Sequence, residues 1–305
     1  MNNFLWRLLT LFLFSIAGNN NLSAQQKNIV FQTDFGLKDG AVAAMKGVAI
    51  TTDSSLRLFD LTHEIPAYNV WEAAYRLEQT IPYWPAGTVF VSVVDPGVGT
   101  NRQSVVLKTK SGHYIVTPDN GTLTLVAETQ GIEAIRRIDE SINRRRGSEN
   151  SYTFHGRDVY AYTAARLASG IISFEKVGPL LPATVVKIPY QKAVSENDII
   201  KGSIPVLDVQ YGNIWTNIPA TMLKQNNINT GDELQVSIYE DSTLKYQGFL
   251  KLVATFGDVP TGKALAYYNS LMNLSFAINM GNFSALHKVY SGNNWKVEIK
   301  RVATK

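Results

Sequence analysis

The sequence predicts an α/β protein, in which an N-terminal α/β sheet domain is followed by a smaller C-terminal antiparallel β-barrel domain. Short β-rich runs alternate with helical periods from residue 28 to about 170, which is typical of strands covered by helices. After about residue 182 the helical periods vanish, and short strands with turn residues continue to the end of the chain. A chain of 305 residues, of which 45% are hydrophobic, is long enough for two domains.

The first domain is predicted to contain five strands and three helices. The strands are predicted at 29–32, 56–61, 88–94, 104–108 and 113–117, and the helices at 40–50, 70–81 and 158–168. Pro82 and Pro85 end the second helix, and Gly170 ends the third. Because Ser111 and Gly112 separate the last two strands, these strands are expected to form a hairpin.

The second domain is predicted to contain only short strands, arranged as a small antiparallel barrel or sandwich. They are predicted at 203–209, 233–239, 243–253, 264–268 and 295–300. The change in pattern follows the stretch from Gly178 to Pro182, so a boundary is expected near residue 190. The predicted domains are therefore residues 28–188 and 196–303.

The first residues predict an export signal. Arg7 supplies a positive charge, residues 8–17 form an apolar run, and Ala24 offers a small residue at a cleavage site. The apolar run is too short to span a bilayer, and the chain has no cysteine for a lipid anchor. We expect residues 1–24 to be removed, leaving a periplasmic or secreted protein without stable membrane association. An uncleaved membrane anchor is the weaker alternative.

Composition limits the kinds of site and partner. The absence of cysteine excludes disulfides, a thiolate nucleophile and cysteine-rich zinc sites. The four histidines, at positions 63, 113, 155 and 287, show no paired spacing, so no metal site is predicted. The net charge of +4 is mild, and the run Arg144 to Arg146 has no interleaved aromatic residues. We interpret that run as a solvated loop, and no nucleic-acid partner is expected.

Two carboxylates follow the first predicted strand. Asp34 comes directly after Thr33 at the end of the strand, and Asp39 precedes the next helix. In open α/β proteins this edge of the sheet binds ligands. Asp39 would serve as a helix N-cap whether or not it had another function. Asp34 has no such role in view, and a carboxylate there could accept two hydrogen bonds from a ribose diol; the pattern leaves that interpretation open.

Two further clusters in the first domain contain residues suited to catalysis. The loop from Asp95 to Arg102 follows a buried strand, and its glycines let the backbone approach a ligand, although a simple ion pair between the two end residues is the simpler explanation. His155 precedes Gly156 at the start of a helix for which Asp158 is the predicted N-cap. We expect His155 to be accessible and to titrate near neutral pH.

The second domain carries a cluster of amide and aromatic side chains after Asp208. Alternation along a strand puts Asn213, Trp215 and Asn217 on one face, close to Tyr211. Such a face suits a flat heterocycle that stacks on aromatic rings and hydrogen bonds through its edge. It also suits an ordinary barrel core, and the pattern does not decide between the two.

Taken together, these clusters resemble the family of S-adenosylmethionine (SAM) hydrolases, also called SAM hydroxide adenosyltransferases, which is related to fluorinating and chlorinating enzymes that use the same substrate. The resemblance covers nearly all of the chain after the predicted signal, in family order. The matching stretches are Thr33-Asp34-Phe35-Gly36, Asp60-Leu61-Thr62-His63-Glu64-Ile65, Val94-Asp95-Pro96-Gly97-Val98-Gly99-Thr100, Pro118-Asp119-Asn120-Gly121, Thr153 to Asp158, Tyr211 to Asn217 and Asn269-Ser270.

The resemblance implies a homotrimer whose substrate lies between the first domain of one subunit and the second domain of its neighbour. It implies that Asp34 holds the ribose hydroxyls, Asp208 the methionine ammonium, Ser270 the methionine carboxylate and Asn213 the adenine edge. The remaining substrate-binding residues that it implies are Tyr68, Thr153, Phe154, Tyr211, Trp215 and Phe256.

Asp95, Arg102 and His155 match the catalytic triad of the hydrolases, which implies that activated water attacks the ribose 5′ carbon of SAM. No separate cofactor is implied, because SAM is itself the substrate. Fluorinating relatives lack the Asp-Pro-Gly-Val-Gly loop and the histidine, and they carry a long insertion where this chain has only the connection 108–113. Two alternatives remain: a halide-using adenosyl transferase and an exported protein that binds an adenosyl ligand without catalysis.

Overall fold

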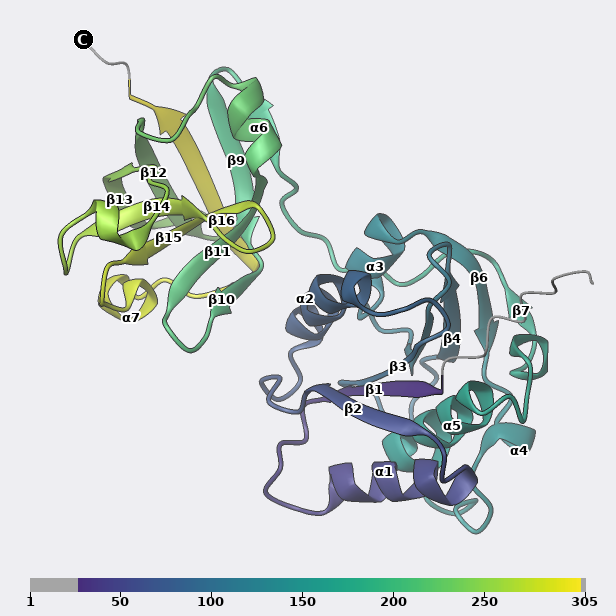
Figure 1. Ribbon diagram of the computed structural model, residues 1–305. Helices are drawn as coiled ribbons and strands as arrows, with labels where there is room; N and C mark the ends of the chain where they lie inside the picture. Colours follow the sequence, from purple (N-terminus) through teal and green to yellow (C-terminus); the bar gives the residue numbers. More distant parts are fainter. Residues whose placement is uncertain (1–26, 303–305) are drawn as a thin grey trace, which may run out of the picture.

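The computed structural model describes residues 27–302, and the predicted signal segment 1–24 lies outside the described residues (Figure 1). A seven-stranded mixed sheet forms the first half of the molecule, in the order β2-β1-β3-β5-β4-β6-β7. Its strands are β1 (Asn28–Thr33), β2 (Arg57–Thr62), β3 (Val89–Val93), β4 (Ser104–Thr109), β5 (Tyr114–Pro118), β6 (Ile132–Arg137) and β7 (Leu180–Leu181). β1 pairs in parallel with β2 and β3, and β3 with β5, whereas β4, β6 and β7 pair antiparallel.

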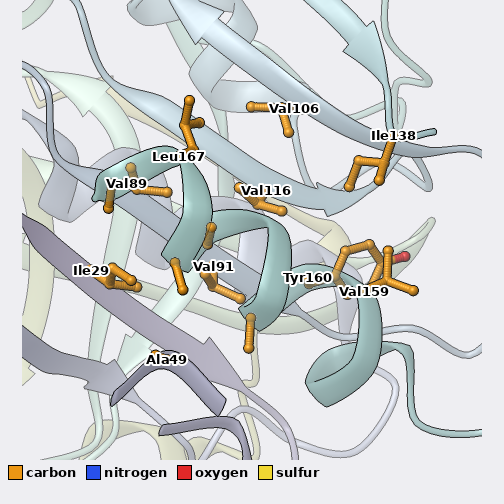
Figure 2. Close-up of a cluster of buried hydrophobic side chains, with 14 of the residues drawn as sticks. Ile29, Ala49, Val89, Val91, Val106, Val116, Ile138, Val159, Tyr160 and Leu167 are labelled. Carbon is orange, nitrogen blue, oxygen red and sulfur yellow. The ribbon is translucent and has the colours of Figure 1, made fainter. Parts of the chain in front are cut away.

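Helices cover both faces of this sheet. They are α1 (Ala41–Thr52), α2 (Val70–Thr80), α3 (Thr124–Thr129), α4 (Glu140–Asn143) and α5 (Tyr162–Ala168), with a π-helical segment, η2 (Gly156–Ala161), leading into α5. Successive side chains of β1 point to opposite faces, so Ile29 packs in the cluster of α1 and α5 while Val30 packs in that of α2 and α3. Figure 2 shows the first cluster, in which Leu167 of α5 and Val159 of η2 belong to the same buried group as the strand residues Val89, Val91 and Val116.

The strands and helices predicted for this half are present, and the expected hairpin is the antiparallel pair β4–β5. The sequence patterns missed α3, β6, α4 and β7, which are short or partly exposed. The predicted N-cap role of Asp158 is wrong, because its buried carboxylate instead accepts hydrogen bonds from Arg157 (2.7 and 2.8 Å).

Two antiparallel sheets form the second half, in the orders β10-β11-β15-β14 and β13-β12-β16-β9-β8. The strands are β8 (Val194–Glu196), β9 (Ile199–Ile204), β10 (Val206–Asp208), β11 (Asn213–Pro219), β12 (Glu233–Glu240), β13 (Thr243–Lys251), β14 (Ala264–Tyr268), β15 (Asn273–Ile278) and β16 (Gly292–Arg301), with short helices α6 (Ala220–Gln225) and α7 (Phe283–His287). One isolated bridge, Leu252 with Ala266, joins the two sheets at the β13–β14 side.

The strand predicted at 203–209 is two strands. Pro205 has no backbone N–H and cannot continue a ladder, so the chain leaves one sheet as β9 and enters the other as β10. The two helices α6 and α7 and the strands β8 and β15 were also missed.

Helix α2 fastens the two halves of the chain together. The Trp71 indole donates to the carbonyl oxygen of Pro205 (3.0 Å), and Arg76 donates to that of Leu207 (3.1 Å). Val206 is buried against Trp71 and Tyr75. The β10 segment that leads to Asp208 is therefore held by the first domain. Between residues 27 and 302 no helix is long and apolar enough to cross a membrane.

Candidate functional site

The carboxyl ends of β1 and β3 meet at one edge of the mixed sheet, where Asp34 and Asp95 follow them. Asp34 accepts a hydrogen bond from the backbone N–H of Tyr68 (2.9 Å), in the loop before α2. Tyr68 has a φ of 68°, a conformation that non-glycine residues rarely adopt, and its side chain is 73% exposed. Asp34 thus holds an exposed aromatic ring beside the edge of the sheet.

A buried histidine, His63, links the two strands that end at this edge of the sheet. The Nδ1 atom of His63 lies 2.8 Å from the hydroxyl of Thr33, and its Nε2 atom lies 2.9 Å from Oδ1 of Asp60. The end of β1 is thereby fixed to the end of β2. The predicted N-cap role of Asp39 is wrong by one position, because α1 has Gly40 as its N-cap; Asp39 instead accepts from the backbone N–H of Ala41 (2.9 Å) just before the helix.

Asp95, Arg102 and His155 form one connected cluster. The Arg102 Nε atom donates to both oxygens of Asp95 (3.0 Å each), and its Nη2 atom donates to Asp95 Oδ2 (2.6 Å). The same Nη2 atom lies 2.8 Å from His155 Nδ1. The simple ion pair between Asp95 and Arg102 is therefore present, and tertiary folding adds to it a histidine 53 residues away in sequence.

The expectation that His155 is accessible is wrong for most of its surface, since it is only 5% exposed. It nevertheless lines the cavity at this edge of the sheet. Burial lowers the pKa of His155 below its usual value; the cations Arg102 and Arg144 lower it further, while Glu140 and Asp95 oppose them. The imidazole is therefore neutral at pH 7.

Four residues that the sequence patterns did not predict as site residues surround this cluster. Tyr160 is fully buried, with its hydroxyl 3.1 Å from that of Ser104 and 3.5 Å from Asp95 Oδ2. Ser104 also accepts from Arg102 Nη1 (3.1 Å). Glu140 and Arg144 lie on the other side of His155. No motif marks these residues, because they are brought together by packing of η2 and α4 against the sheet edge.

The interpretation of 144–146 as a solvated loop holds for two of its three residues. Arg145 and Arg146 are exposed. The Arg144 side chain is only 8% exposed; it pairs with Glu140, and its Nη2 atom lies 3.2 Å from His155 Nε2. Sequence alone could not separate Arg144 from its neighbours, because adjacent arginines share the same local pattern.

The cavity at the sheet edge has a volume of about 250 Å³. It brings together these predicted site residues: Asp34, Tyr68, Asp95, Thr153, Phe154 and His155. Phe35 and Phe154 add an aromatic wall, with ring centroids 6.0 Å apart. The volume lies below the roughly 300–1,000 Å³ that is usual for small-molecule sites, so this cavity is too small to hold a whole adenosylated amino acid.

A second and larger cavity, of about 990 Å³, lies in the C-terminal half. It brings together the remaining predicted binding residues: Asp208, Tyr211, Asn213, Trp215, Phe256 and Ser270. Asn213 Nδ2 donates to Asp208 Oδ2 (3.2 Å), and the Phe256 ring lies 4.9 Å from that of Tyr267. Tyr267 was missed, because its strand β14 carries no other polar signal; burial raises the pKa of its hydroxyl.

Asn217 does not belong to this cavity, contrary to the predicted shared face of Asn213, Trp215 and Asn217. The register of β11 against β15 is irregular after Trp215, which breaks the alternation. The Asn217 amide instead accepts from the backbone of Ser203 (2.8 Å) and donates to that of Gln191 (2.9 Å). Its role is structural.

The two cavities divide the predicted site residues between them and share no lining residue. The first offers two carboxylates, an imidazole and aromatic rings, and the second offers a carboxylate, amides and aromatic rings. Within residues 27–302 no group of three His, Cys, Asp or Glu side chains is placed to hold a metal ion.

Comparison with known proteins gives matches in both halves of the chain. Residues 29–178 match the model of the SAM hydroxide adenosyltransferase N-terminal domain, and residues 202–296 match that of its C-terminal domain. The (R)-S-adenosyl-L-methionine hydrolase of Salinispora tropica is 35% identical over 271 residues, covering 88% of this chain and 97% of the relative.

A more distant relative and a solved structure match over a similar share of the chain. A fluorinase of Nocardia brasiliensis is 28% identical over 297 residues, covering 89% of this chain and 96% of the relative. The crystal structure of an uncharacterized conserved protein from Thermotoga maritima superposes with a TM-score of 0.82 at 36% identity, covering 90% of this chain and all of that one.

Proposed function

The chain belongs to the SAM hydroxide adenosyltransferase family, and from this premise we propose that it hydrolyses S-adenosylmethionine to adenosine and methionine. It is an enzyme, and relatives along nearly its whole length carry the name (R)-S-adenosyl-L-methionine hydrolase. The structural observation that carries the proposal is the cluster in which Arg102 contacts both Asp95 and His155 at the wall of a cavity.

The reaction is a displacement at the ribose 5′ carbon. The oxygen of water forms a bond to this carbon as the bond from carbon to the sulfonium sulfur breaks, and the electron pair of that bond goes to sulfur. The products are adenosine, neutral-sulfur methionine and the proton that water gives up. Positioning an in-line water lowers the activation free energy by up to roughly 7–11 kcal/mol. General-base assistance contributes less, a rate increase of roughly 10²–10⁴-fold.

Asp95 is the group best placed to receive the proton of water. It lines the cavity, and its carboxylate has acceptor capacity beyond the bonds from Arg102. The neutral imidazole of His155 has only one acceptor nitrogen, and both of its ring nitrogens lie within hydrogen-bond distance of an arginine. His155 therefore helps to position Arg102 beside Asp95 at the cavity wall, while the Arg102 cation favours the developing hydroxide.

Asp34 and Asp208 hold the two ends of the substrate. Asp34 has one oxygen on the Tyr68 backbone and one free for the ribose hydroxyls. Asp208 receives the methionine ammonium, Ser270 the carboxylate, and Asn213 the adenine edge, with Tyr211, Trp215 and Phe256 against the base. Because positive charge on sulfur disappears in the transition state, a carboxylate at sulfur would stabilise the ground state more. Both carboxylates therefore act away from sulfur.

The complete site forms between copies of the chain, in a homotrimer. The support is that neither cavity contains the groups of the other. Exposed apolar side chains border each of them: Tyr68 and Tyr152 at the first, Tyr211 and Met280 at the second. Such side chains are costly to leave in water, and a second copy would cover them.

The mature protein acts outside the cytosol, in the periplasm or as a secreted protein. The support is the predicted export signal at residues 1–24. Fractionation of cells that express the full chain, with N-terminal sequencing of the exported form, tests this; a full-length protein in the cytosolic fraction would contradict it.

The activity is tested by incubating the purified protein with SAM and separating the products by chromatography. Adenosine and methionine in equal amounts are expected. A second reaction with added chloride or fluoride is run beside it. A 5′-halo-5′-deoxyadenosine product would identify a halide-using transferase instead, and tightly bound but unaltered SAM would identify a binding protein.

A further inference from the structure

The imidazole of His155 lies between two guanidinium groups. Arg102 approaches Nδ1 at 2.8 Å, and Arg144 approaches Nε2 at 3.2 Å. A protonated imidazole would present N–H donors to both cations, so this arrangement disfavours the charged form by geometry as well as by charge. A neutral imidazole has only one acceptor, so the two arginines compete for it.

Arg144 is held in place by three contacts of its own. It pairs with Glu140 one turn earlier, its Nη1 atom donates to the carbonyl oxygen of Ser151 (3.1 Å), and its guanidinium stacks 5.2 Å from the centre of the Tyr152 ring. Holding an arginine side chain in one conformation costs side-chain entropy, which these contacts offset. The contacts therefore indicate a fixed role at His155.

We propose that Glu140 and Arg144 are positioning residues for His155, which hold its ring in place from the side opposite Arg102. This inference rests on the proposed function of His155 in hydrolysis. The two residues form a second ion pair that mirrors the pair of Asp95 and Arg102. The imidazole is thus fixed between two guanidiniums, each anchored by its own carboxylate.

The other charged and titratable groups around the ring agree with this assignment. Asp95 and Arg102 face it from the sheet edge, and Glu140 and Arg144 from α4. Tyr152 and Tyr160 contact it edge-on, at centroid distances of 6.5 and 6.4 Å. Arg144 lowers the pKa of His155 and Glu140 raises it, so removing each should have opposite effects.

The test compares Arg144→Gln and Glu140→Gln by NMR titration of the His155 ring protons. The titration midpoint should rise in the first variant and fall in the second. Arg146→Gln, an exposed residue of the same loop, serves as the matched control and should leave the midpoint unchanged. Shifts in the same direction, or no shift in either variant, would overturn the proposal.

Kinetics with SAM give the second readout. In Arg144→Gln we expect kcat to fall about tenfold with little change in KM, which is part of the roughly 10²–10⁴-fold that proton-handling groups contribute. Arg144→Lys, which keeps the charge but not the forked geometry, should recover part of the loss. If the wild-type protein releases no adenosine, the proposed function fails, while the titration still decides whether this pair controls His155.

Discussion

At the scale of single residues, His155 shows most clearly how the fold changes a side chain. Free in solution its imidazole would titrate with a pKa of about 6.5. In the protein it is buried and flanked by Arg102 and Arg144, so its pKa lies below that value. Although it is hidden from bulk solvent, it lines the cavity where we propose that the attacking water binds.

Replacing His155 with alanine tests its role directly. We expect kcat for adenosine release to fall by roughly 10²–10⁴-fold, with KM changed much less, because the ribose and methionine contacts remain. Steady-state kinetics at several SAM concentrations measure both constants. Turnover at the wild-type rate would reject any part for His155 in handling water.

The lowered pKa of His155 also fixes the direction of the pH dependence. Activity should be retained at pH 6.5 and decrease only at lower pH, where the imidazole takes up a proton. The unfolded chain takes up this proton at about pH 6.5 whereas the folded chain resists it, so the contribution of His155 to stability decreases as pH falls through 6.5. A pH–rate profile with its acidic limb above pH 6.5 would contradict this.

Asp34 is expected to act on affinity instead of rate. Asp34→Ala removes charge-assisted hydrogen bonds to the ribose, each worth about 1.5–3 kcal/mol, so the Kd for adenosine should rise at least tenfold. Isothermal titration calorimetry with adenosine measures this. Asp39→Ala is the matched control, since that carboxylate contacts only the Ala41 backbone in the described structure. Equal affinities of the two variants would reject the assignment of Asp34.

At the scale of elements, the segment that leads into β7 and packs beside the end of β6 depends on one glycine. Gly178 has a φ of 151°, and a Cβ atom there would lie 2.2 Å from the carbonyl oxygen of Arg137. Arg136 also donates to the Gly178 carbonyl oxygen (2.8 Å). The antiparallel edge of the mixed sheet therefore depends on a backbone conformation that other residues rarely adopt.

Gly178→Ala should lower the free energy of unfolding by about 2–4 kcal/mol, because a backbone contact must open to admit the methyl group. Gly47→Ala is the control: it lies exposed in α1 with no atom within 4 Å of the added Cβ, so helix propensity should raise stability by about 0.8–1 kcal/mol. Urea unfolding measures both. A Gly178→Ala protein as stable as the wild type would refute the proposed need for glycine at this position.

Helix α2 contacts functional segments in both halves of the chain. Its N-cap, Asn69, follows directly after Tyr68, whose backbone binds Asp34. Further along the helix, Trp71 and Arg76 donate hydrogen bonds to the backbone carbonyl oxygens of the segment that leads to Asp208. One helix therefore positions parts of both cavities within a chain.

At the scale of the whole molecule, the division of the site between two cavities leads to a test of assembly. His155→Ala damages the first cavity and Asp208→Ala the second. In a mixed trimeric ring of both variants about one third of the interfaces would join two intact halves, so activity should reappear on mixing. Co-expression with two affinity tags and assay of the doubly purified protein measures this.

The control for that experiment is a mixture of Asp34→Ala with His155→Ala. Both changes lie in the first cavity, so no interface in this mixture has an intact first half. Mixed oligomers of the His155→Ala and Asp208→Ala variants that are no more active than this control would show that the site is completed within one chain.

The sequence by itself determined most of the elements and their order. Alternating apolar patterns, prolines and glycines act over a few neighbouring residues, so most strands and helices up to Gly170 could be predicted from them, whereas α3, β6 and α4 were missed. It also placed Asp34 and Asp95 at the ends of strands, and hence at one edge of the sheet. Short or interrupted elements were lost, as where Pro205 divides one predicted strand into β9 and β10.

Only the tertiary structure decided which side chains meet. It placed Arg102 between Asp95 and His155, selected Arg144 from three adjacent arginines, and removed Asn217 from the binding face. These outcomes depend on contacts between segments far apart in sequence and on one irregularity of strand register. Local patterns carry no information about such contacts, because burial and charge at a side chain are set by whatever the fold packs against it.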